Sequence, residues 1–272
     1  MVSRDAQASL DRGHSGRLPC HTPRAMALPW QPLETVDTPD GPLTLMRRGE
    51  RDFLLTIRGR VLMTSAAHRS EDDLARLACE GLGKDAPARV LVSGLGMGFT
   101  LRAALDVLGP RAWVVVAELN PIVARWCEGP LGVLTNHALR DRRVRLVVGD
   151  VTEVLREVAE GAEARRFDAV VLDMYEGPQQ RVPRHHPLYG AEAVATTRRA
   201  LVEGGTFAVW CEQRSADFER ALRTVGFTFE MKRTGHGGRV HLVYLAQSAR
   251  KTKTDANVPR APGRRRGPSP SR

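Results

Sequence analysis

The stretch from Arg89 to Asp106, RVLVSGLGMGFTLRAALD, constrains the fold more than any other part of the sequence. Apolar, β-prone residues run directly into Gly94, Gly96 and Gly98, and apolar residues then recur at helical spacing. The pattern predicts a strand, a glycine turn and a helix, which would present its free N–H groups and positive dipole end to a ligand. Glycine suits such a turn because it tolerates restricted backbone conformations and close approach of a ligand. A tightly packed turn without a ligand is the alternative.

An acidic residue follows the next predicted strand. Residues 113–117 are apolar and β-prone, and Glu118 comes directly after them, about 20 residues past the glycines. A carboxylate at this place in a nucleotide-binding unit can accept hydrogen bonds from both hydroxyls of a ribose. The alternative for Glu118 is a charge at the entry of the helix that starts at Pro121. Together the turn and the acid favour a nucleoside site.

Strands and helices alternate along most of the chain. The predicted elements are strands at 89–93, 113–117, 143–148, 167–172 and 205–210, helices at 98–108, 121–128, 152–160, 190–202 and 215–225, and final strands at 227–232 and 239–246. This alternation predicts an α/β fold with a doubly wound, mostly parallel seven-stranded sheet and helices on both faces. In such a sheet ligands bind at the carboxyl ends of the strands, where the strand order reverses.

The region before this alternation has a different pattern. Short alternating segments at 43–47, 53–58 and 60–64 predict a small antiparallel sheet of two or three strands. Ser70, with an acid three residues later, predicts the cap of the helix that follows. We therefore expect four parts: a disordered segment at 1–29, a small β-sheet at 30–68, a nucleoside-binding catalytic domain at 69–248 and a disordered basic tail at 249–272.

The formal net charge of +10 is concentrated in the tail. Residues 249–272 hold eight Lys or Arg and one Asp, so they carry seven of the ten charges and residues 1–248 carry three. With four prolines and almost no apolar residues, the tail lacks the surface needed to fold. The cluster at 264–266 leaves weak contact with nucleic acid open, and a solvated tail is the alternative.

Cysteine usage and hydropathy bear on the compartment. The four cysteines form no CxxC pair, which predicts reduced thiols and gives no sign of a zinc site or a disulfide framework. No apolar run approaches the roughly 18 to 20 residues that span a bilayer, and the N-terminus lacks the apolar core of a signal peptide. We expect a cytoplasmic protein with no membrane contact and no metal.

Two further acids end predicted strands. Asp150 follows the third strand and is placed either to accept a hydrogen bond from an adenine amino group or to cap the helix starting at Val151. Asp173 follows the apolar run AVVL, so its carboxylate lies at the mouth of a buried strand and is partly desolvated unless it has a partner. Both acids would face the same crevice as the glycine turn and Glu118.

Several stretches in this order resemble the spermidine synthase family, a branch of the class I methyltransferase-like, Rossmann-like fold. They are GLGMG, AELNP, GDV, LDMYEGP and ALVEGGTFAVW, together with GRVLMTS in the small sheet. The resemblance covers roughly residues 41–246. It implies an S-adenosyl-type nucleoside held by Gly94, Gly96, Gly98, Glu118 and Asp150. It also implies that Asp173 is the acid beside the attacking amine, with Tyr175 and Glu176 of LDMYEGP as the other catalytic candidates.

The sequence departs from the family pattern at three places. Met97 stands where the glycine turn of the family carries an acid, Glu176 stands where a second aspartate is usual, and HRSEDDLARLA lacks the Tyr-His-Glu signature that helps to cradle the polyamine. An acceptor with two or three positive charges would meet fewer carboxylates here, and an unpaired buried ammonium costs several kcal/mol. The sequence therefore predicts an amine acceptor other than putrescine.

The resemblance implies an enzyme, a transferase that moves an aminopropyl group from decarboxylated S-adenosylmethionine to a small amine. Methyl transfer from S-adenosylmethionine to a small acceptor is the first alternative. The second is a nucleoside-binding protein of the same fold that does not catalyse, since Met97 replaces an expected acid. The nucleoside acts as a co-substrate in either reaction. A homodimer is left open.

Overall fold

A computed structural model of the chain describes residues 28–162, 165–234 and 240–248. Apart from residues 28 and 29, the segments expected to be disordered, 1–29 and 249–272, lie outside the described residues. Within the described residues, no helix is both long and apolar enough to cross a membrane.

The large sheet has seven strands in the order β10-β11-β9-β8-β5-β6-β7. Its strands are β5 (Arg89–Ser93), β6 (Trp113–Glu118), β7 (Val144–Val148), β8 (Phe167–Leu172), β9 (Leu201–Cys211), β10 (Phe227–Thr234) and β11 (His241–Ser248). The pairs among β5 to β9 are parallel, whereas β11 runs antiparallel to both β9 and β10. The predicted doubly wound, mostly parallel seven-stranded sheet is confirmed.

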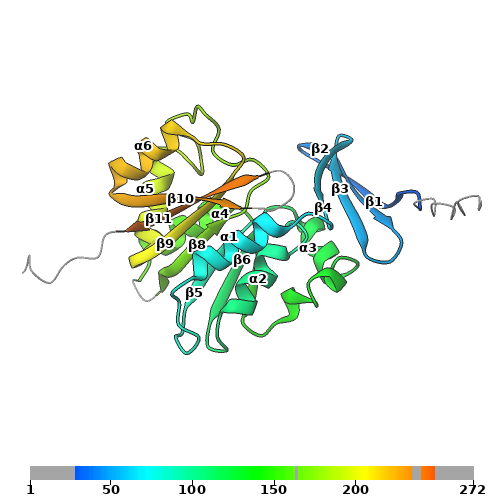
Figure 1. Cartoon of the computed structure of the whole chain (residues 1–272), viewed down its shortest axis with the longest axis horizontal. Helices are drawn as coiled ribbons and strands as arrows, with labels where there is room; N and C mark the ends of the chain where they lie inside the picture. Colours follow the sequence, from blue (N-terminus) through cyan, green and yellow to red (C-terminus); the bar gives the residue numbers. More distant parts are fainter. Residues whose placement is uncertain (1–27, 163–164, 235–239, 249–272) are drawn as a thin grey trace, which may run out of the picture.

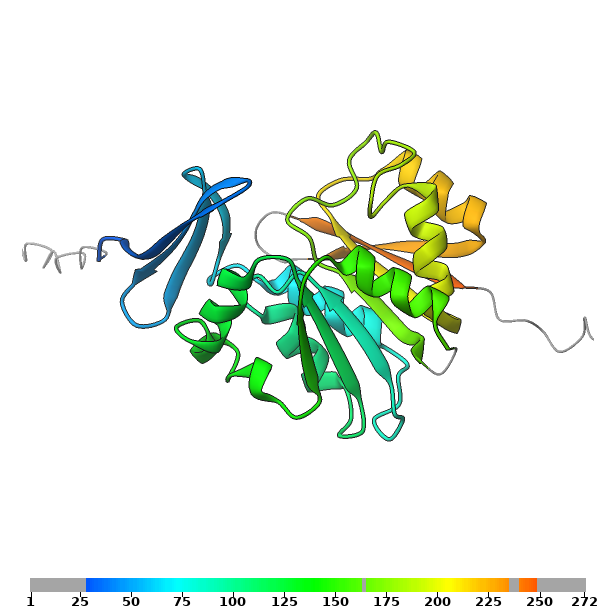
Figure 2. The ribbon, with the colours of Figure 1, turned by 180° about the vertical axis from the view of Figure 1, so that it is seen from behind.

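Helices cover both faces of this sheet, as Figures 1 and 2 show from opposite sides. One face carries α1 (Arg69–Cys79), α2 (Phe99–Val107) and α3 (Pro121–Glu128), and the other carries α4 (Val151–Glu160), α5 (Ala191–Ala200) and α6 (Ala216–Val225). Alternation along β5 explains the two layers. Val90 and Val92 pack into the cluster of the first face, while Leu91 packs into the second, because successive side chains of a strand point to opposite sides.

The strand order reverses between β5 and β8. From β5 the chain moves outward through β6 to β7, and it then crosses back to form β8 on the other side of β5. Connections leaving the carboxyl ends of these two strands diverge, and in sheets of this kind ligands bind at that edge. The glycine turn follows β5 and Asp173 follows β8, so the reversal brings these two predicted features together.

The small sheet has four strands rather than the expected two or three. They are β1 (Gln31–Thr38), β2 (Gly41–Arg48), β3 (Asp52–Ile57) and β4 (Arg60–Thr64), paired antiparallel in that order. The first strand was missed because its sequence, QPLETVDT, is polar and largely exposed and shows little apolar alternation. Leu45 and Phe53 belong to the same buried cluster as α1 and α2, so the division of the chain near residue 68 stays a prediction.

Two local predictions were wrong. Ser70 does not cap α1: the cap position is His68, and the Ser70 hydroxyl lies inside the helix, where it donates to the Glu71 carboxylate. Strand β9 begins at Leu201 rather than near 205, since Leu201 already pairs with Phe167 across a register shift in β8. The Ser70 hydroxyl bonds to the Glu71 side chain instead of capping the helix. The start of β9 is set by its pairing with β8 and not by its own sequence pattern.

Arg143 closes the carboxyl end of α2. Its Nη1 donates to the carbonyl oxygens of Leu105, Leu108 and Gly109 at 3.0, 2.8 and 3.3 Å. The Nε and Nη2 atoms donate to the Asp141 carboxylate at 3.0 and 2.8 Å. These bonds satisfy carbonyl groups that a helix end leaves unpaired. Mainly through these side-chain bonds, Arg143 lowers the pKa of Asp141 to about 2.

The Arg143→Met variant is expected to lose about 2 kcal/mol of unfolding free energy near pH 7, because the carbonyl oxygens and Asp141 lose their donors. Arg142→Met, at the exposed neighbouring position, should change stability by less than about 0.5 kcal/mol. The lowered pKa of Asp141 stabilises the fold above its unfolded value of about 3.9. That contribution is lost as pH falls toward about 2, so the difference from wild type should narrow over this range. Urea unfolding at several pH values measures the difference in unfolding free energy between Arg143→Met and wild type. If that difference does not change with pH, the ion pair between Arg143 and Asp141 does not contribute as proposed.

Candidate active site

The predicted strand, glycine turn and helix are present between Ser93 and Phe99. Gly94, Gly96 and Gly98 have φ angles of 85°, 51° and 87°, in the left-handed region that favours glycine. The turn also passes very close to the backbone at the carboxyl end of β8. A Cβ on Gly94 would lie 2.1 Å from the carbonyl oxygen of Asp173. The conformation and the packing therefore both require glycine at position 94.

Three hydrogen bonds from other elements hold the turn. The backbone N–H of Leu95 donates to Glu118 Oε2 at 2.8 Å, and that of Gly94 donates to the carbonyl of Ala117 at 3.0 Å. From α3, the thiol of Cys127 donates to the carbonyl of Gly96 at 3.3 Å. Sequence reasoning missed Cys127, because a single cysteine in an apolar helix carries no pattern that points to the turn.

Glu118 is buried at the end of β6, with 8% of its surface exposed. Its Oε1 accepts the N–H of Asn120 at 2.8 Å, and its Oε2 accepts that of Leu95 at the same distance. Burial raises the pKa of Glu118, and these two hydrogen bonds act in the opposite direction. Since each carboxylate oxygen has a second lone pair, both oxygens can still accept from a ribose hydroxyl. The ribose role stays a prediction.

Asp150 is exposed directly after β7 and caps α4. Its Oδ1 accepts the N–H of Thr152 at 2.8 Å. Of the two roles considered from the sequence, the cap is therefore present. The cap uses one oxygen, so the hydrogen bond to an adenine amino group through Oδ2 stays a prediction.

Asp173 lies at the carboxyl end of β8 and is tied to both elements beside it. Its backbone N–H donates to the carbonyl of Ser93 at 2.9 Å, and its Oδ2 accepts the hydroxyl of Thr100 from the first turn of α2. Burial raises the pKa of Asp173 to about 7. The negative charge of Glu71, on α1, adds to the rise, and the Thr100 hydrogen bond opposes it.

Glu71 and Thr100 are site residues that the sequence reasoning missed. Glu71 lies between Ser70 and Asp73 of the expected helix cap and Thr100 in the helix expected after the glycines, and neither was singled out as a site residue. Only the packing of α1 and α2 beside β8 brings both residues to Asp173.

Tyr175 and Glu176 lie on the loop after β8, and both are exposed. The Tyr175 hydroxyl, on a residue 47% exposed, accepts a hydrogen bond from Arg60 of the small sheet at 3.1 Å. The backbone carbonyl of Glu176 accepts the Tyr189 hydroxyl at 3.0 Å, which leaves the Glu176 carboxylate outside that contact. The small sheet thus contacts the loop that follows β8, and the catalytic roles of both residues stay predictions.

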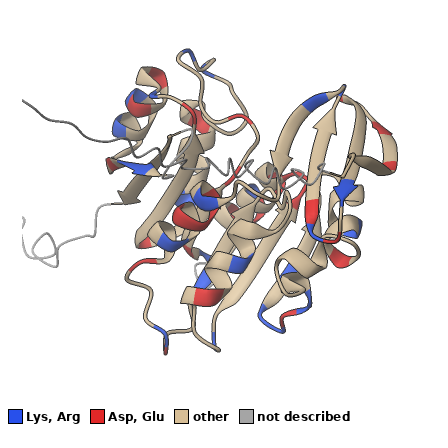
Figure 3. Ribbon diagram, turned by 45° about the vertical axis from the view of Figure 1, so that its right-hand side comes forward, with Lys and Arg blue, Asp and Glu red and all other residues tan. Residues whose placement is uncertain are grey.

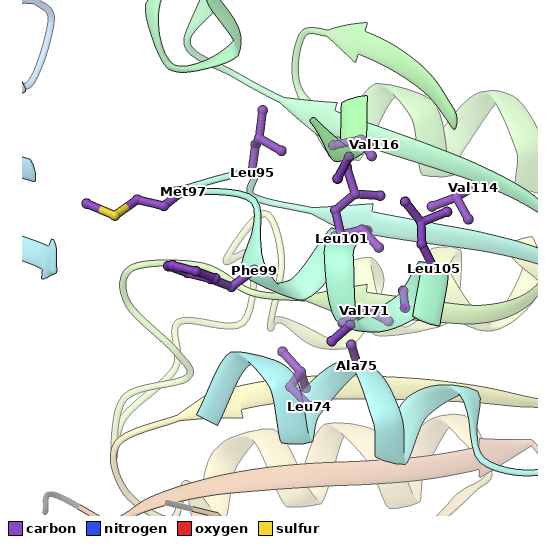
Figure 4. Packing of buried hydrophobic residues seen from close by; sticks show 14 of the residues in the cluster. Leu74, Ala75, Leu95, Met97, Phe99, Leu101, Leu105, Val114, Val116 and Val171 are labelled. Carbon is purple, nitrogen blue, oxygen red and sulfur yellow. The ribbon is translucent and has the colours of Figure 1, made fainter. Parts of the chain in front are cut away.

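Met97 is almost completely buried, with 1% of its surface exposed. Figure 4 shows its side chain extending from the turn on the opposite side from Leu101 and Leu105 of α2. It belongs to the apolar cluster that also includes residues of the small sheet. Met97, one of the three departures from the family pattern, therefore contributes packing and no charge.

The distribution of charged groups gives no sign of a metal centre. In the described part of the chain, no three His, Cys, Asp or Glu side chains are grouped so that they could hold a metal ion. Figure 3 shows acidic and basic positions interspersed along the helices. The acids that matter here, Glu118, Asp150 and Asp173, instead follow successive parallel strands at one edge of the sheet.

Comparisons with known proteins found relatives that match part of the chain. No family model matches the chain. It is 35% identical over 124 residues to polyamine aminopropyltransferase 2 of Streptomyces coelicolor and 24% identical over 143 residues to the polyamine aminopropyltransferase of Sulfolobus acidocaldarius. These matches cover 45% and 51% of this chain. They cover 21% and 45% of the relatives, so the chain spans less than half the length of the curated relatives it matches.

Solved structures match over more of the chain. The spermidine synthase of Thermotoga maritima superposes with a TM-score of 0.61 at 18% identity, over 83% of this chain and 75% of that one. The chain therefore has the fold of this spermidine synthase. A spermidine synthase in complex with the transition-state analogue AdoDATO gives 0.61 at 17% identity, over 84% and 76%. A probable spermidine synthase from Corynebacterium glutamicum gives 0.55 at 18%, over 79% of each chain. The spermidine synthase-like resemblance and the Rossmann-like fold that it implied are confirmed.

Proposed function

We propose that this chain is a transferase that moves an aminopropyl group from decarboxylated S-adenosylmethionine to an amine acceptor other than putrescine. The observation that carries the proposal is Asp173, a carboxyl group with a pKa of about 7 beside the glycine turn, where the strand order reverses. The names of the two curated relatives and the analogue bound to a spermidine synthase of the same fold support it.

The residues proposed to hold the nucleoside have the properties this requires. Gly94, Gly96 and Gly98 leave the turn without side chains, and the first turn of α2 offers free N–H groups to a polar ligand. Glu118 keeps one lone pair on each oxygen for the ribose hydroxyls, and Asp150 keeps Oδ2 for the adenine amino group.

The chemistry requires a base near the acceptor. An alkyl amine has a pKa of about 10.4, so about one molecule in 10³ is neutral at pH 7. In the proposed step the nitrogen lone pair forms a bond to the carbon next to the sulfonium, the carbon–sulfur bond breaks, and its electrons stay on sulfur as a thioether. Asp173 accepts the proton that the nitrogen loses. Tyr175 and Glu176 are proposed to orient the amine from the loop after β8.

The proposed acceptor follows from the charges that face Asp173. Glu71 supplies a second carboxylate, whereas Met97 supplies none. Two carboxylates suit the ammonium form of the one nitrogen that reacts, and a second ammonium elsewhere on the acceptor would lack a partner. We therefore propose a small amine with a single positive charge.

Methyl transfer from S-adenosylmethionine is the second candidate, and Met97 favours it. The decarboxylated nucleoside brings its own ammonium, which an acid at position 97 would neutralise, and the buried apolar side chain cannot. A protein that binds the nucleoside without turnover is the third candidate, because Met97 replaces an acid that the reaction would use.

The proposal includes a cytoplasmic location, since the three cysteines that the structure describes are free. The proposal also includes a homodimer and a weak contact of the tail with nucleic acid, and both rest on the sequence alone.

Calorimetric titration with each nucleoside tests the proposal. The decarboxylated form should bind at least about tenfold more tightly, a difference of about 1.4 kcal/mol, and turnover with monoamines should follow. Tighter binding of intact S-adenosylmethionine would favour methyl transfer. Binding of the decarboxylated form without transfer to any amine would favour the non-catalytic protein. If neither nucleoside gives a heat of binding, the proposed nucleoside site is wrong.

A further inference from the structure

Thr100 occupies an unusual position for a threonine in the first turn of a helix. It is 1% exposed, and its hydroxyl donates to Oδ2 of Asp173 across the gap between α2 and β8. In helices a threonine hydroxyl often bonds back to the carbonyl four residues earlier. Here that carbonyl belongs to Gly96 and accepts the thiol of Cys127. The Thr100 hydroxyl instead donates to the Asp173 carboxylate.

The groups that face Asp173 come from several elements. Glu71 approaches from α1, Thr100 from α2, and Tyr189 from the segment before α5. Burial raises the pKa of Tyr189, and the charges of Cys211 and Asp173 add to the rise. Glu71 disfavours a second negative charge on Asp173. Tyr189 directs its hydroxyl to the carbonyl of Glu176. The hydrogen bond to the carboxylate of Asp173 is provided by Thr100.

We propose that Thr100 is a positioning residue, which fixes Oδ2 of Asp173 by its hydrogen bond and leaves Oδ1 to meet the reacting amine. The inference rests on the proposed function, because the amine belongs to that reaction. A donor to the ionised carboxylate favours the charged form, so Thr100 also counteracts burial and Glu71. A carboxyl that is held and kept ionised is what a base close to neutral pH requires.

The test compares Thr100→Val, which keeps the shape but removes the hydroxyl, with Thr100→Ser, which keeps the hydroxyl. Carbon NMR of protein labelled with ¹³C at the aspartate side-chain carboxyl gives the pKa of Asp173 directly, and Asp173→Asn assigns its signal. Thr100→Val should raise this pKa by about one unit, and Thr100→Ser should leave it near the wild-type value. The acid limb of kcat/KM should move upward by the same amount in Thr100→Val alone.

The outcomes separate this inference from the proposed function. If the NMR pKa of Asp173 is the same in Thr100→Val and wild type, or if Thr100→Ser behaves like Thr100→Val, the positioning role is wrong. Melting temperatures of both variants identify any loss of folding. The NMR titration needs no turnover. If wild-type protein transfers no aminopropyl group, the proposed function fails, while the shift of the carboxyl signal still decides what Thr100 does to Asp173.

Discussion

Asp173→Asn is expected to lower kcat by about 10² to 10⁴-fold, the usual contribution of a positioned general base. Asparagine has nearly the same shape, and its side-chain oxygen can still accept the Thr100 hydroxyl. The backbone bond from Asp173 to Ser93 is untouched by the change. Nucleoside binding should therefore remain within about threefold of wild type, because a change below 0.7 kcal/mol is expected where no contact is lost.

Asp168→Asn provides the matched control. Asp168 lies at the start of the same strand, β8, and accepts the N–H of Arg89 at 2.7 Å at the opposite edge of the sheet. An asparagine there can keep that hydrogen bond, so turnover should be nearly unchanged. Equal losses in the two variants would point to a structural effect on β8. Unchanged turnover in Asp173→Asn would remove Asp173 as the base.

The pH profile of the wild-type protein belongs to the same experiment. The Asp173 carboxyl has a pKa of about 7 because burial and Glu71 disfavour its charged form. A base must be ionised to accept a proton, so kcat/KM should rise with pH up to about 7 and then level off from this group. The raised pKa also means that Asp173 favours folding less as pH rises through 7, since the folded state holds this proton more tightly than the unfolded state.

The fold could be predicted where local pattern and tertiary packing agree. The run RVLVSGLGMG combines β-prone residues with glycines that need positive φ, and the structure has both the strand and the turn there. Strand β1 was not predicted from its pattern, because an exposed edge strand needs little apolar alternation. The strand order was not predicted: the alternating pattern implies only that the order reverses somewhere in the sheet, and the structure has the reversal between β5 and β8.

The candidate site was predictable only in part, for a different reason. Glu118 ends a strand and Asp150 and Asp173 follow strands, so all three lie at the same edge of the parallel sheet whatever the details of packing. Thr100 is 73 residues from Asp173 along the chain, and its role depends on how α2 lies against the end of β8. Glu71 depends in the same way on α1. No local pattern specifies the distance between side chains on two packed helices and a strand.

Gly94→Ala has the second large expected effect, and it links the stability of the fold to the site. An alanine at φ 85° is strained by about 1 to 2 kcal/mol. Its Cβ would also lie 2.1 Å from the carbonyl oxygen of Asp173, so the backbone at the end of β8 must move. Forced displacement in a packed region costs about 1 to 3 kcal/mol more. At about 2 to 4 °C per kcal/mol, the melting temperature should fall by about 4 to 20 °C.

Gly81→Ala separates the two causes. Gly81 has almost the same φ, 89°, but no atom lies within 4 Å of the position of its Cβ. This variant should therefore lose only the strain, a fall of about 2 to 8 °C, and should keep its turnover. In Gly94→Ala the displaced segment carries the catalytic carboxyl, and a shift of about 1 Å in such a group costs about 10²-fold in rate. Equal melting temperatures for the two variants would mean that the turn yields without moving β8, and turnover would then identify whether the carboxyl of Asp173 has kept its place.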